Sequence, residues 1–383
     1  MRLVINGRFL AQPVTGVQRY AREVVAALDQ QLDRWPGCSA ELLVPAGVQV
    51  PSYERIAVRS VGRLHGHAWE QLELPRHYRG DVLFCPANTA PVATLLSRRA
   101  VVVTVHDLSY RYFPAAYTRA FRLLYNTVIP VVMRRAMSII TVSHAERAQI
   151  LRHYPAAAAR LAVVPNGGAP EVAGAVSPDL EAMRPYLLYV GSFSRRKNFD
   201  GVLATARRLL EERPELRMVL VGGTPEVFRQ VEQDAQPHPR MIFAGQINDP
   251  AALLPYYRSA EALLFPSFYE SSGLPPVEAM ACGCPVIASE IPALVERCGS
   301  AALYCDPGNA EDIHRQTVRL LDDPALRQSL VAEGLQRCRD FTWESCAAQT
   351  MEQIIEAASL KESRNEALAS TPGGSAAPER TGT

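Results

Sequence analysis

Short apolar runs of strand length alternate with amphipathic stretches along the 383-residue chain, and this alternation limits strongly how the chain can fold. The amphipathic stretches have the spacing of helices with one buried face. Strands that alternate with helices in this way form parallel sheets covered by helices on both sides. The alternation occurs twice, on either side of a segment rich in Gly, Ala and Pro at 167–185. The sequence therefore predicts an α/β fold with two doubly wound, Rossmann-like domains.

The expected strands are 3–5, 41–44, 82–85, 101–105, 138–142 and 161–164 in the first half, and 186–190, 218–221, 241–244, 262–265, 286–288 and 302–304 in the second. Among the expected helices, 17–32 and 341–358 are amphipathic, and 199–212 fills a gap between two strands. The helical stretch 114–135 is expected to break near Pro130, because proline cannot donate the helical hydrogen bond.

These elements divide the chain into four parts. We expect a first domain at 1–175, a second domain at 176–340, a helix at 341–358 that packs back toward the first domain, and a disordered tail at 362–383. The tail is rich in Ser, Thr, Gly, Pro and Ala, so it offers too little apolar surface to fold by itself.

The composition is that of a soluble globular protein, with 48% hydrophobic and 21% charged residues. No apolar signal segment opens the sequence, and the most apolar long window, 123–142, is interrupted by Pro130, Arg134 and Arg135. We therefore expect no membrane-spanning helix. The eight cysteines are scattered without a zinc-binding spacing, so we expect thiols in a reducing, cytoplasmic compartment.

One turn, Glu270 to Glu278 with the sequence ESSGLPPVE, follows the expected strand 262–265 and leads into a helix-like run. Ligands of open α/β sheets bind at this edge, outside the carboxyl ends of the strands. Gly273 allows a backbone to approach a ligand closely. The free amides of Leu274 and the first helical turn suit a phosphate.

The two glutamates of this turn would repel a phosphate, so they need another partner. An ionised carboxylate only accepts hydrogen bonds, and sugar hydroxyls donate them. Hydroxyls on both sides of a diphosphate describe a nucleotide-sugar, with ribose at one end and a hexose at the other. The alternative is that Glu270 and Glu278 only complement the dipole of the following helix.

A second turn, 191–198 with the sequence GSFSRRKN, also lies between an expected strand and an expected helix. The chain contains 38 arginines and only two lysines, Lys197 and Lys361, so Lys197 is the only lysine inside either domain. A lysine presents a compact point charge, whereas an arginine presents a wide planar fork. Lys197 and an adjacent arginine could neutralise a leaving diphosphate, or they could be surface charges at the start of a helix.

These turns resemble the signatures of retaining glycosyltransferases of family 4, also described as group 1, which have the GT-B fold. The family pattern has two glutamates with seven residues between them around Gly-Phe-Gly-Leu-Pro, followed by Glu-Ala-Met-Ala-Cys-Gly. Its other turn carries Arg-Lys-Asn or Arg-Lys-Gly. Here Ser271 and Ser272 replace Gly-Phe, and Ser192 replaces an arginine that many members carry. A second cation would therefore come from Arg195 or Arg196.

Three more loops occur in the order that the family shows. Gly16 resembles the N-terminal glycine loop that closes on the donor from the first domain. His106, followed by Asp107 at a strand end, resembles the histidine near the transferred sugar, although a lone histidine is more often structural. The loop around Ile247 stands where the family holds the nucleobase by backbone contacts.

The resemblance covers nearly the whole chain and implies two domains facing across a cleft, with hexosyl transfer from a nucleotide-diphosphate sugar. Glu270 would hold the hexose and Glu278 the ribose. No metal is expected, because protein cations neutralise the diphosphate. The expected catalytic residues are Glu270, His106 and Lys197, and the expected donor-binding residues are Gly16, Arg196, Lys197, Ile247, Glu270, Gly273, Leu274 and Glu278.

The segments 6–10 and 15–20 resemble bacterial transferases of surface polysaccharides such as O-antigen or exopolysaccharide, particularly mannosyl-type enzymes. This favours GDP-mannose as the donor and a glycan or lipid-linked glycan as the acceptor, with no nucleic-acid partner. One alternative is a soluble GT-B synthase with a small acceptor. The other is a non-catalytic sugar-nucleotide-binding protein, against which the intact Glu270, Lys197 and Glu278 argue.

The net charge of +1 hides an asymmetry between the two halves. Residues 1–175 contain 20 arginines and 11 acidic residues, which gives +9, and residues 176–383 carry −8. The basic half includes a segment, 110–135, rich in arginine and aromatic residues, which suits an anionic interface or an ordinary helix with a tyrosine-rich core face. We expect a cytoplasmic protein whose first domain could bind peripherally to the inner face of the membrane.

Overall fold

The computed structural model describes residues 1–168, 178–223 and 238–369. Two separate sheets, each with all strands parallel, form the centres of two domains. The predicted α/β fold with two doubly wound, Rossmann-like domains is confirmed. The expected boundary at 175/176 and the end of the expected tail, from 370 onward, lie outside the described residues.

The first sheet has seven strands in the order β3-β2-β1-β4-β5-β6-β7. Its strands are β1 (Arg2–Asn6), β2 (Ser39–Val44), β3 (Ile56–Ser60), β4 (Val82–Cys85), β5 (Ala100–Thr104), β6 (Ser138–Thr141) and β7 (Leu161–Val163). Successive side chains of β1 point to opposite faces of the sheet. Leu3 and Ile5 pack with α1 (Gly16–Gln31), whereas Val4 packs on the other face with α6 (Arg119–Arg135).

The second sheet has six strands in the order β10-β9-β8-β11-β12-β13. Its strands are β8 (Tyr186–Val190), β9 (Arg217–Val221), β10 (Met241–Gly245), β11 (Ala262–Phe265), β12 (Val286–Ser289) and β13 (Leu303–Cys305). In both sheets the chain starts near the middle and crosses outward in both directions. Their carboxyl ends therefore lie beside a change in strand order, where ligands of such folds bind.

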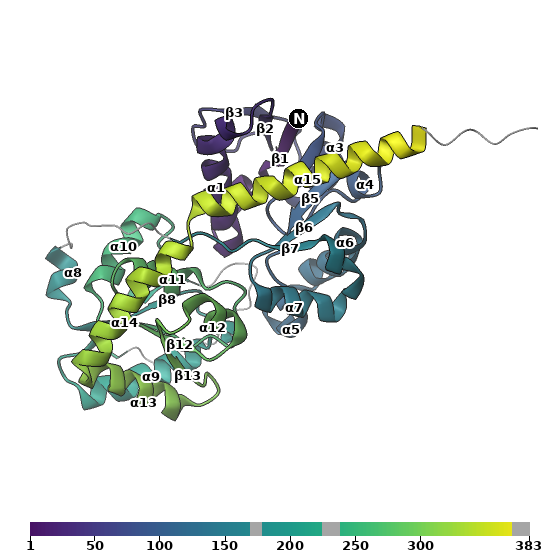
Figure 1. Cartoon of the computed structure of the whole chain (residues 1–383). Coiled ribbons are helices and arrows are strands. Elements are labelled where there is room, and N and C mark those ends of the chain that lie inside the picture. Colours follow the sequence, from purple (N-terminus) through teal and green to yellow (C-terminus); the bar gives the residue numbers. More distant parts are fainter. Residues whose placement is uncertain (169–177, 224–237, 370–383) are drawn as a thin grey trace, which may run out of the picture.

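Helices cover both faces of each sheet (Figure 1). The remaining helices of the first domain are α2 (Gly66–Ala68), α3 (Leu74–His77), α4 (Val92–Leu95), α5 (Ser109–Tyr112) and α7 (His144–His153), with a π-helical turn η3 (Trp69–Glu73) between α2 and α3. Those of the second are α8 (Pro178–Ala182), α9 (Phe199–Glu212), α10 (Pro250–Ser259), α11 (Leu274–Ala281), α12 (Pro292–Cys298), α13 (Ala310–Asp322) and α14 (Pro324–Arg337).

The last helix, α15 (Trp343–Ala369), leaves the second domain and runs along the first (Figure 1). Met351, Ile354 and Ala357 of this helix are fully buried in the core cluster of the first domain. The expectation of disorder from 362 is wrong for 362–369, where the helix continues. Lys361, whose Nζ donates to the backbone oxygen of Asp81 at 3.0 Å, fixes the helix just before this extension.

The helix α6 contradicts the expected break near Pro130, because it continues through this proline to Arg135. Proline removes one helical hydrogen bond to the residue four positions earlier. That residue, Asn126, is exposed, so water can replace the lost bond. On both sides of Pro130, Ile129 and Val132 are fully buried and hold the helix against the sheet.

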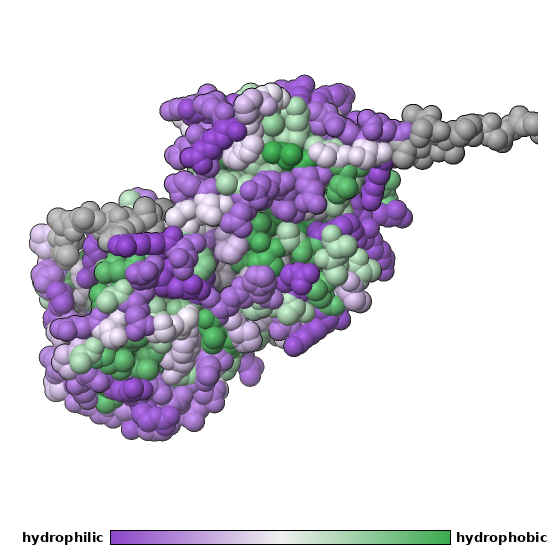
Figure 2. Space-filling model, viewed as in Figure 1, coloured by the Kyte–Doolittle hydropathy of each residue, from purple (hydrophilic) through white to green (hydrophobic). Residues whose placement is uncertain are grey.

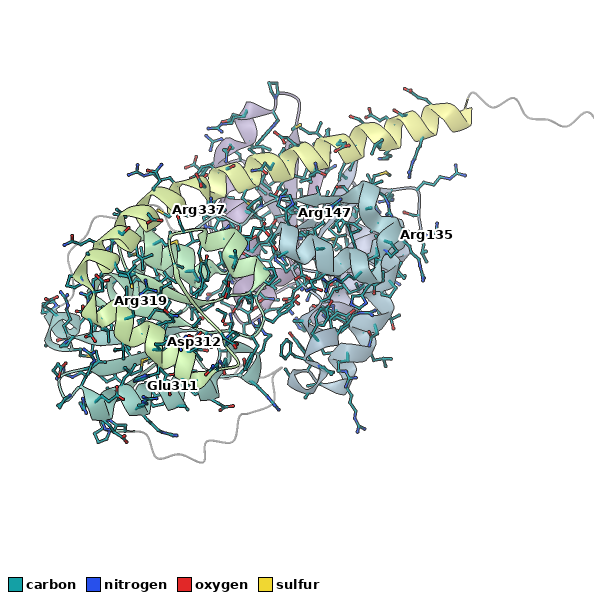
Figure 3. The ribbon with its side chains drawn as sticks, turned by 60° about the horizontal axis from the view of Figure 1, so that its bottom comes forward. Arg135, Arg147, Glu311, Asp312, Arg319 and Arg337 are labelled. Carbon is teal, nitrogen blue, oxygen red and sulfur yellow. The ribbon has the colours of Figure 1, made fainter. Side chains whose placement is uncertain are left out.

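Within the described residues, none of the helices combines the length and the apolar composition that a membrane span requires. On the face shown in Figure 2, hydrophobic residues form several separate patches among hydrophilic ones. Charged side chains line both domains, with Arg135 and Arg147 on the first and Glu311 and Asp312 on the second (Figure 3).

Candidate functional site

The two turns that the sequence singles out meet at the carboxyl edge of the second sheet. Nζ of Lys197 lies 2.5 Å from Oε1 of Glu270, and Nη1 of Arg196 lies 4.0 Å from Oε2 of the same carboxylate. That arginine nitrogen also donates a hydrogen bond to the backbone oxygen of Tyr269 at 3.2 Å. Two cations therefore surround one carboxylate in a mostly buried cluster.

The electrostatics of this cluster extend to the first domain. Burial lowers the pKa of Lys197 below its ordinary value, although Glu270 acts in the opposite direction. The charge of Asp107, which follows β5 of the first domain, also acts on the pKa values of Lys197 and Arg196. Fixed charges in a site that excludes water stabilise developing charge more than they would in solution. The cluster can therefore stabilise an anionic leaving group.

The start of α11 offers backbone donors beside these cations. Gly273 has a φ of 68°, in the left-handed region that glycine tolerates, and a Cβ atom there would come within 2.7 Å of the Leu294 side chain. Leu274 begins the helix, and Pro275 and Pro276 follow. Because prolines have no amide hydrogen, only Gly273 and Leu274 remain of the four donors that a helix start provides.

Glu278 lies one turn further along α11, is 1% exposed and has two partners. Its Oε1 lies 2.5 Å from Nη2 of Arg19, and its Oε2 accepts a hydrogen bond from the Tyr257 hydroxyl at 2.9 Å. Because Arg19 belongs to α1, this ion pair joins the two domains.

The glycine loop of the first domain also touches the second domain. The backbone oxygen of Val14 accepts a hydrogen bond from Nε2 of Gln246 at 3.2 Å. Gln246 precedes Ile247 in the loop after β10, so the loop expected at the nucleobase lies beside the loop that contains Gly16. The space around Gly16 is open, because a Cβ atom there would meet no other atom within 4 Å.

His106 lies at the carboxyl end of β5 and is 4% exposed. Its Nε2 is 2.8 Å from the backbone oxygen of Pro86, so this nitrogen carries the hydrogen and donates it. Its backbone amide donates to Oδ1 of Asn88, and its ring stands edge-on to Tyr20 with centroids 4.6 Å apart. Burial lowers the pKa of His106, which keeps the imidazole neutral. These three contacts all lie within the first domain.

Sequence comparison agrees with this geometry. A family model described as "Glycosyltransferase Family 4" matches residues 14–171, and one described as "Glycosyl transferases group 1" matches residues 176–337. The chain is a glycosyltransferase composed of these two family domains. The resemblance inferred from the turns and the prediction of an enzyme are thereby confirmed.

This glycosyltransferase has curated relatives with named activities. The O-antigen chain mannosyltransferase B of Escherichia coli is 29% identical over 92% of this chain and 98% of its own length. A D-inositol 3-phosphate glycosyltransferase of Rhodococcus jostii is 29% identical, but over only 54% of this chain and 50% of its own.

Solved structures establish the GT-B fold of the glycosyltransferase. Sucrose-phosphate synthase of Thermosynechococcus elongatus superposes with a TM-score of 0.68 at 22% identity, over 96% of this chain and 100% of that one. HepE of Anabaena in complex with UDP-glucose gives a TM-score of 0.69 at 16% identity, over 93% of this chain and 100% of that one.

Sequence reasoning missed three residues of this interface: Arg19, Glu146 and Tyr269. Arg19 stands in the first turn of α1, where the helix dipole disfavours a cation, and this was a signal that it has a partner. Glu146 was hidden by its place three residues after the cap Ser143, where a glutamate usually completes a capping box. Its carboxylate instead accepts a hydrogen bond from the hydroxyl of Tyr269, in the second domain, at 2.6 Å.

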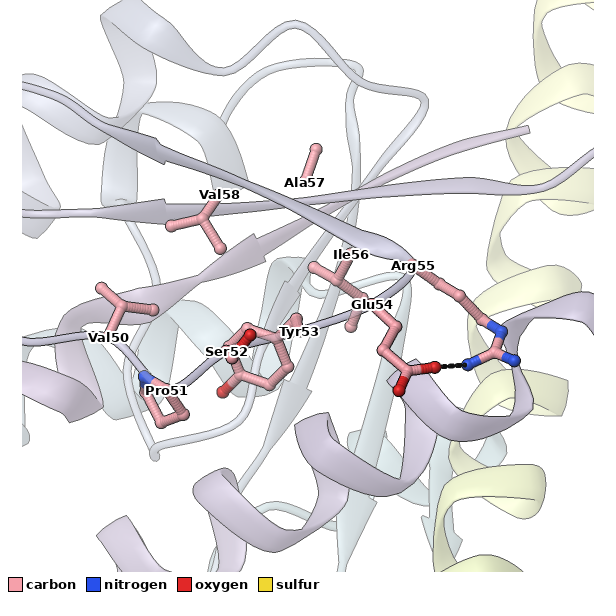
Figure 4. Close-up of a pocket in the computed structure, with 9 residues that line it drawn as sticks. All are labelled: Val50, Pro51, Ser52, Tyr53, Glu54, Arg55, Ile56, Ala57 and Val58. Atoms are coloured by element: carbon pink, nitrogen blue, oxygen red, sulfur yellow. Dashed lines mark hydrogen bonds and ion pairs between the residues drawn. The ribbon is translucent and has the colours of Figure 1, made fainter.

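No group of three or more His, Cys, Asp and Glu side chains that could hold a metal occurs in the part of the chain that the structure describes. A surface pocket is lined by the residues 50–58, which belong to the loop that connects β2 to β3 and to the start of β3 (Figure 4). Glu54 and Arg55 form an ion pair beside it. None of the predicted site residues lines this pocket, so it is separate from the candidate site.

Proposed function

We propose that this glycosyltransferase moves a hexose, with mannose favoured, from a nucleotide-diphosphate sugar to a hydroxyl of a glycan or lipid-linked glycan. The bond between the anomeric carbon and the diphosphate oxygen breaks, and its electron pair stays on the diphosphate. The acceptor oxygen bonds to the anomeric carbon with retention of configuration, and the proton of the acceptor hydroxyl goes to the departing diphosphate. The observation that carries the proposal is the buried cluster of Lys197, Arg196 and Glu270 at the carboxyl edge of the second sheet. The mannosyltransferase name of the relative matched over 92% of the chain supports GDP-mannose and synthesis of a surface polysaccharide, O-antigen or exopolysaccharide.

In this proposal the second domain, 176–340, binds the donor, and the first domain, 1–175, binds the acceptor. Hexose hydroxyls donate to Glu270, which frees Lys197 to approach the diphosphate together with Arg196. The amides of Gly16, Gly273 and Leu274 complete the phosphate contacts.

The two ends of the donor meet residues that already lie at the domain interface. Ribose hydroxyls take the place of Arg19 on Glu278, and the backbone beside Ile247 holds the base. The neutral imidazole of His106 lies toward the sugar and the acceptor. Because two protein cations stand ready for the diphosphate, the proposal requires no metal.

The proposed location is the cytoplasm, with reversible attachment to the inner face of the membrane through the first domain. Tyr110 and Tyr125 are buried in the core, and Phe121 stacks on Tyr125 with centroids 4.0 Å apart. Tyr110, Phe121 and Tyr125 therefore belong to a core face, whereas Tyr112 is 38% exposed. What supports membrane contact is the exposed remainder of α6, where Leu123 is 72% exposed and Arg119, Arg134 and Arg135 are also exposed.

The test of the proposed reaction is a panel of nucleotide-sugars, with released nucleotide as the readout and GDP-mannose expected to give the highest rate. Nuclear magnetic resonance of the product should show the anomeric configuration of the donor. Inverted product would contradict retention, and transfer only to a small soluble acceptor would favour the synthase alternative. No turnover with any donor would favour a binding protein.

Vesicle flotation tests the membrane contact. We expect the protein to be recovered with anionic vesicles at low salt. Recovery should fall as salt is added, because at about 0.1 M the attraction decays over about 10 Å. A folded R119A/R122A/R134A/R135A variant should bind more weakly than the wild type. Each arginine near such a surface contributes about 1 kcal/mol. Equal recovery with neutral and anionic vesicles would contradict the contact.

A further inference from the structure

Tyr269, the residue before Glu270, reaches from the second domain into the first. Its hydroxyl donates a hydrogen bond to Oε2 of Glu146 at 2.6 Å. Its ring packs against Tyr112 and Phe113 of the first domain, with centroid distances of 5.7 and 5.9 Å. The backbone that carries Glu270 is therefore attached to the opposite domain by its immediate neighbour.

Glu146 is buried at 1% exposure, although a buried carboxylate is costly unless it is paired. Ser143 caps α7 by accepting a hydrogen bond from the Glu146 amide at 3.0 Å. The carboxylate, however, accepts from the amide of Leu108 at 3.2 Å and from the Tyr269 hydroxyl. Its two oxygens thus join the loop after β5 to the second domain.

The backbone on the other side of Tyr269 is fixed to the cations of the candidate site. Its carbonyl oxygen accepts from Nη1 of Arg196, and the amide of Phe268 donates to the backbone oxygen of Arg196 at 3.0 Å. Glu270 follows and pairs with Lys197. A shift of Tyr269 would therefore move the carboxylate and the arginine of the cluster together.

A second contact on the same turn of α7 provides a comparison. The amides of His144 and Ala145 donate to the two carboxylate oxygens of Glu296, each at 2.8 Å. Glu296 belongs to α12 of the second domain, on a different element from Glu270. One turn of α7 thus binds the second domain twice, and only the contact through Glu146 adjoins the candidate site.

We propose that Glu146 is a positioning residue for glycosyl transfer. It accepts a hydrogen bond from the Tyr269 hydroxyl across the domain interface and thereby fixes the backbone that carries Glu270. This inference rests on the proposed function. Docking of the first domain then aligns the donor cluster as well as bringing the acceptor near. A displacement of about 1 Å at a reacting group can reduce the rate about 10²-fold.

The experiment compares steady-state kinetics of the full chain carrying Glu146→Ala, Tyr269→Phe or both. We expect each single variant to lower kcat by about 10- to 100-fold while the donor KM changes less than about threefold. The double variant should be no slower than the slower single variant, since both changes remove one interaction. Glu146→Gln keeps an accepting oxygen and should recover at least part of the lost kcat.

Glu296→Gln is the matched control, because it weakens the other contact to the same turn of α7. We expect its kcat to stay within about threefold of the wild type, since Glu296 does not adjoin Glu270. An equal loss in this control, additive effects in the double variant, or an unchanged kcat in Tyr269→Phe would each overturn the inference.

Two further outcomes separate this inference from the proposed function. Tyr269→Phe removes only a hydroxyl, so it tests the contact even if Glu146→Ala does not fold. A wild-type protein without turnover on any nucleotide-sugar would overturn the proposed function and this inference with it. An active wild type with unaffected variants would overturn only the inference.

Discussion

The carboxyl edges of the two sheets differ in how their charged side chains are paired. In the first domain, Nε of the buried Arg8 lies 2.6 Å from Oε2 of Glu70, and the same guanidinium donates to Thr89 at 3.1 Å. In the second domain, Arg196 and Lys197 share the single carboxylate of Glu270. The Arg8–Glu70 pair of the first edge therefore balances one cation with one carboxylate, whereas the cluster of the second edge has a cation in excess.

This difference indicates that the charges of the first edge stabilise its loops, whereas those of the second edge suit an anionic ligand. The Arg8–Glu70 pair holds loops together and leaves no surplus charge for an anion. The surplus cation of the second edge suits a diphosphate, and Asp107 of the first domain acts on it when the domains are together. The electrostatic environment of the second edge is thus completed only across the domain interface.

The largest expected effect is on the stability of the first edge. Glu70→Ala should lower the free energy of unfolding by about 3–5 kcal/mol, because it leaves the Arg8 guanidinium buried without its counter-ion. Urea denaturation measures the change. The double variant R8M/E70L should regain much of the loss, and a loss below about 1 kcal/mol in Glu70→Ala would show that the pair is not the support of this edge.

At the second edge the expected effect is on catalysis. Lys197→Ala should lower kcat about 10²- to 10³-fold, which corresponds to about 2.7–4 kcal/mol of lost transition-state stabilisation. Lys361→Ala is the matched control, since the only other lysine of the chain lies on α15. A rate for Lys197→Ala within a few-fold of this control would remove Lys197 from the site.

The glycine turns of the two edges should also respond differently. Gly273→Ala should cost about 1–3 kcal/mol of stability, because alanine disfavours a φ of 68° and its Cβ meets Leu294. Gly16→Ala has open space and should preserve stability or raise it by up to about 1 kcal/mol. Thermal unfolding distinguishes the two, and an equal loss in both would contradict the difference.

The last expected effect is gradual, a pH dependence of stability at the contact between the edges. Burial, and then the neighbouring Asp107, raise the pKa of Glu146 from 4.5 to about 8, although the hydrogen bond from Tyr269 acts to lower it. Tyr112 also faces this carboxyl. Because the folded protein keeps this proton at a pH where the unfolded chain has lost it, the free energy of unfolding falls as the pH rises. The contribution is fully present below pH 4.5 and is lost as the pH rises toward 8. Glu146→Gln removes this loss.

The difference in unfolding free energy between Glu146→Gln and the wild type should therefore shift in favour of the variant from pH 5 to pH 8. The shift is at most about 1.4 kcal/mol per pH unit. Denaturation curves across this range measure it. A constant difference would show that Glu146 does not titrate there. The lowered pKa of His106 makes the free energy of unfolding rise with pH, which is the opposite direction, but this contribution is the same in the variant and the wild type.

Much of the fold follows from periodicity and turn residues, and the failures have physical causes. The helix α9 begins and ends as expected, at Phe199 and Glu212, because its apolar spacing is regular. The edge strand β3 was not expected, because in Ile56–Ser60 only Ile56 is buried and the pattern is weakly apolar. The extension of α15 to Ala369 is polar, and composition alone cannot distinguish a solvated helix from a disordered tail.

The candidate site divides in the same way. Lys197, Glu270 and Glu278 could be singled out from sequence because they stand in turns with distinctive composition. The interface residues Arg19, Glu146 and Tyr269 were not singled out, because pairing between domains depends on how two separately folded sheets meet. A local pattern such as the place of Arg19 at the start of α1 indicates that a partner exists, but not which residue it is.

The course of α15 has a consequence for the synthesis of the protein. Residues 343–369 are translated after the second domain, yet Cys346, Met351 and Ile354 complete the core of the first domain, which is translated before it. Domains usually fold in the order in which they leave the ribosome. Here the first domain to emerge is the last to be completed, and its apolar surface waits uncovered while the whole second domain is made. A chain that stops before α15 would therefore be a target for chaperones and proteases even though both sheets are present.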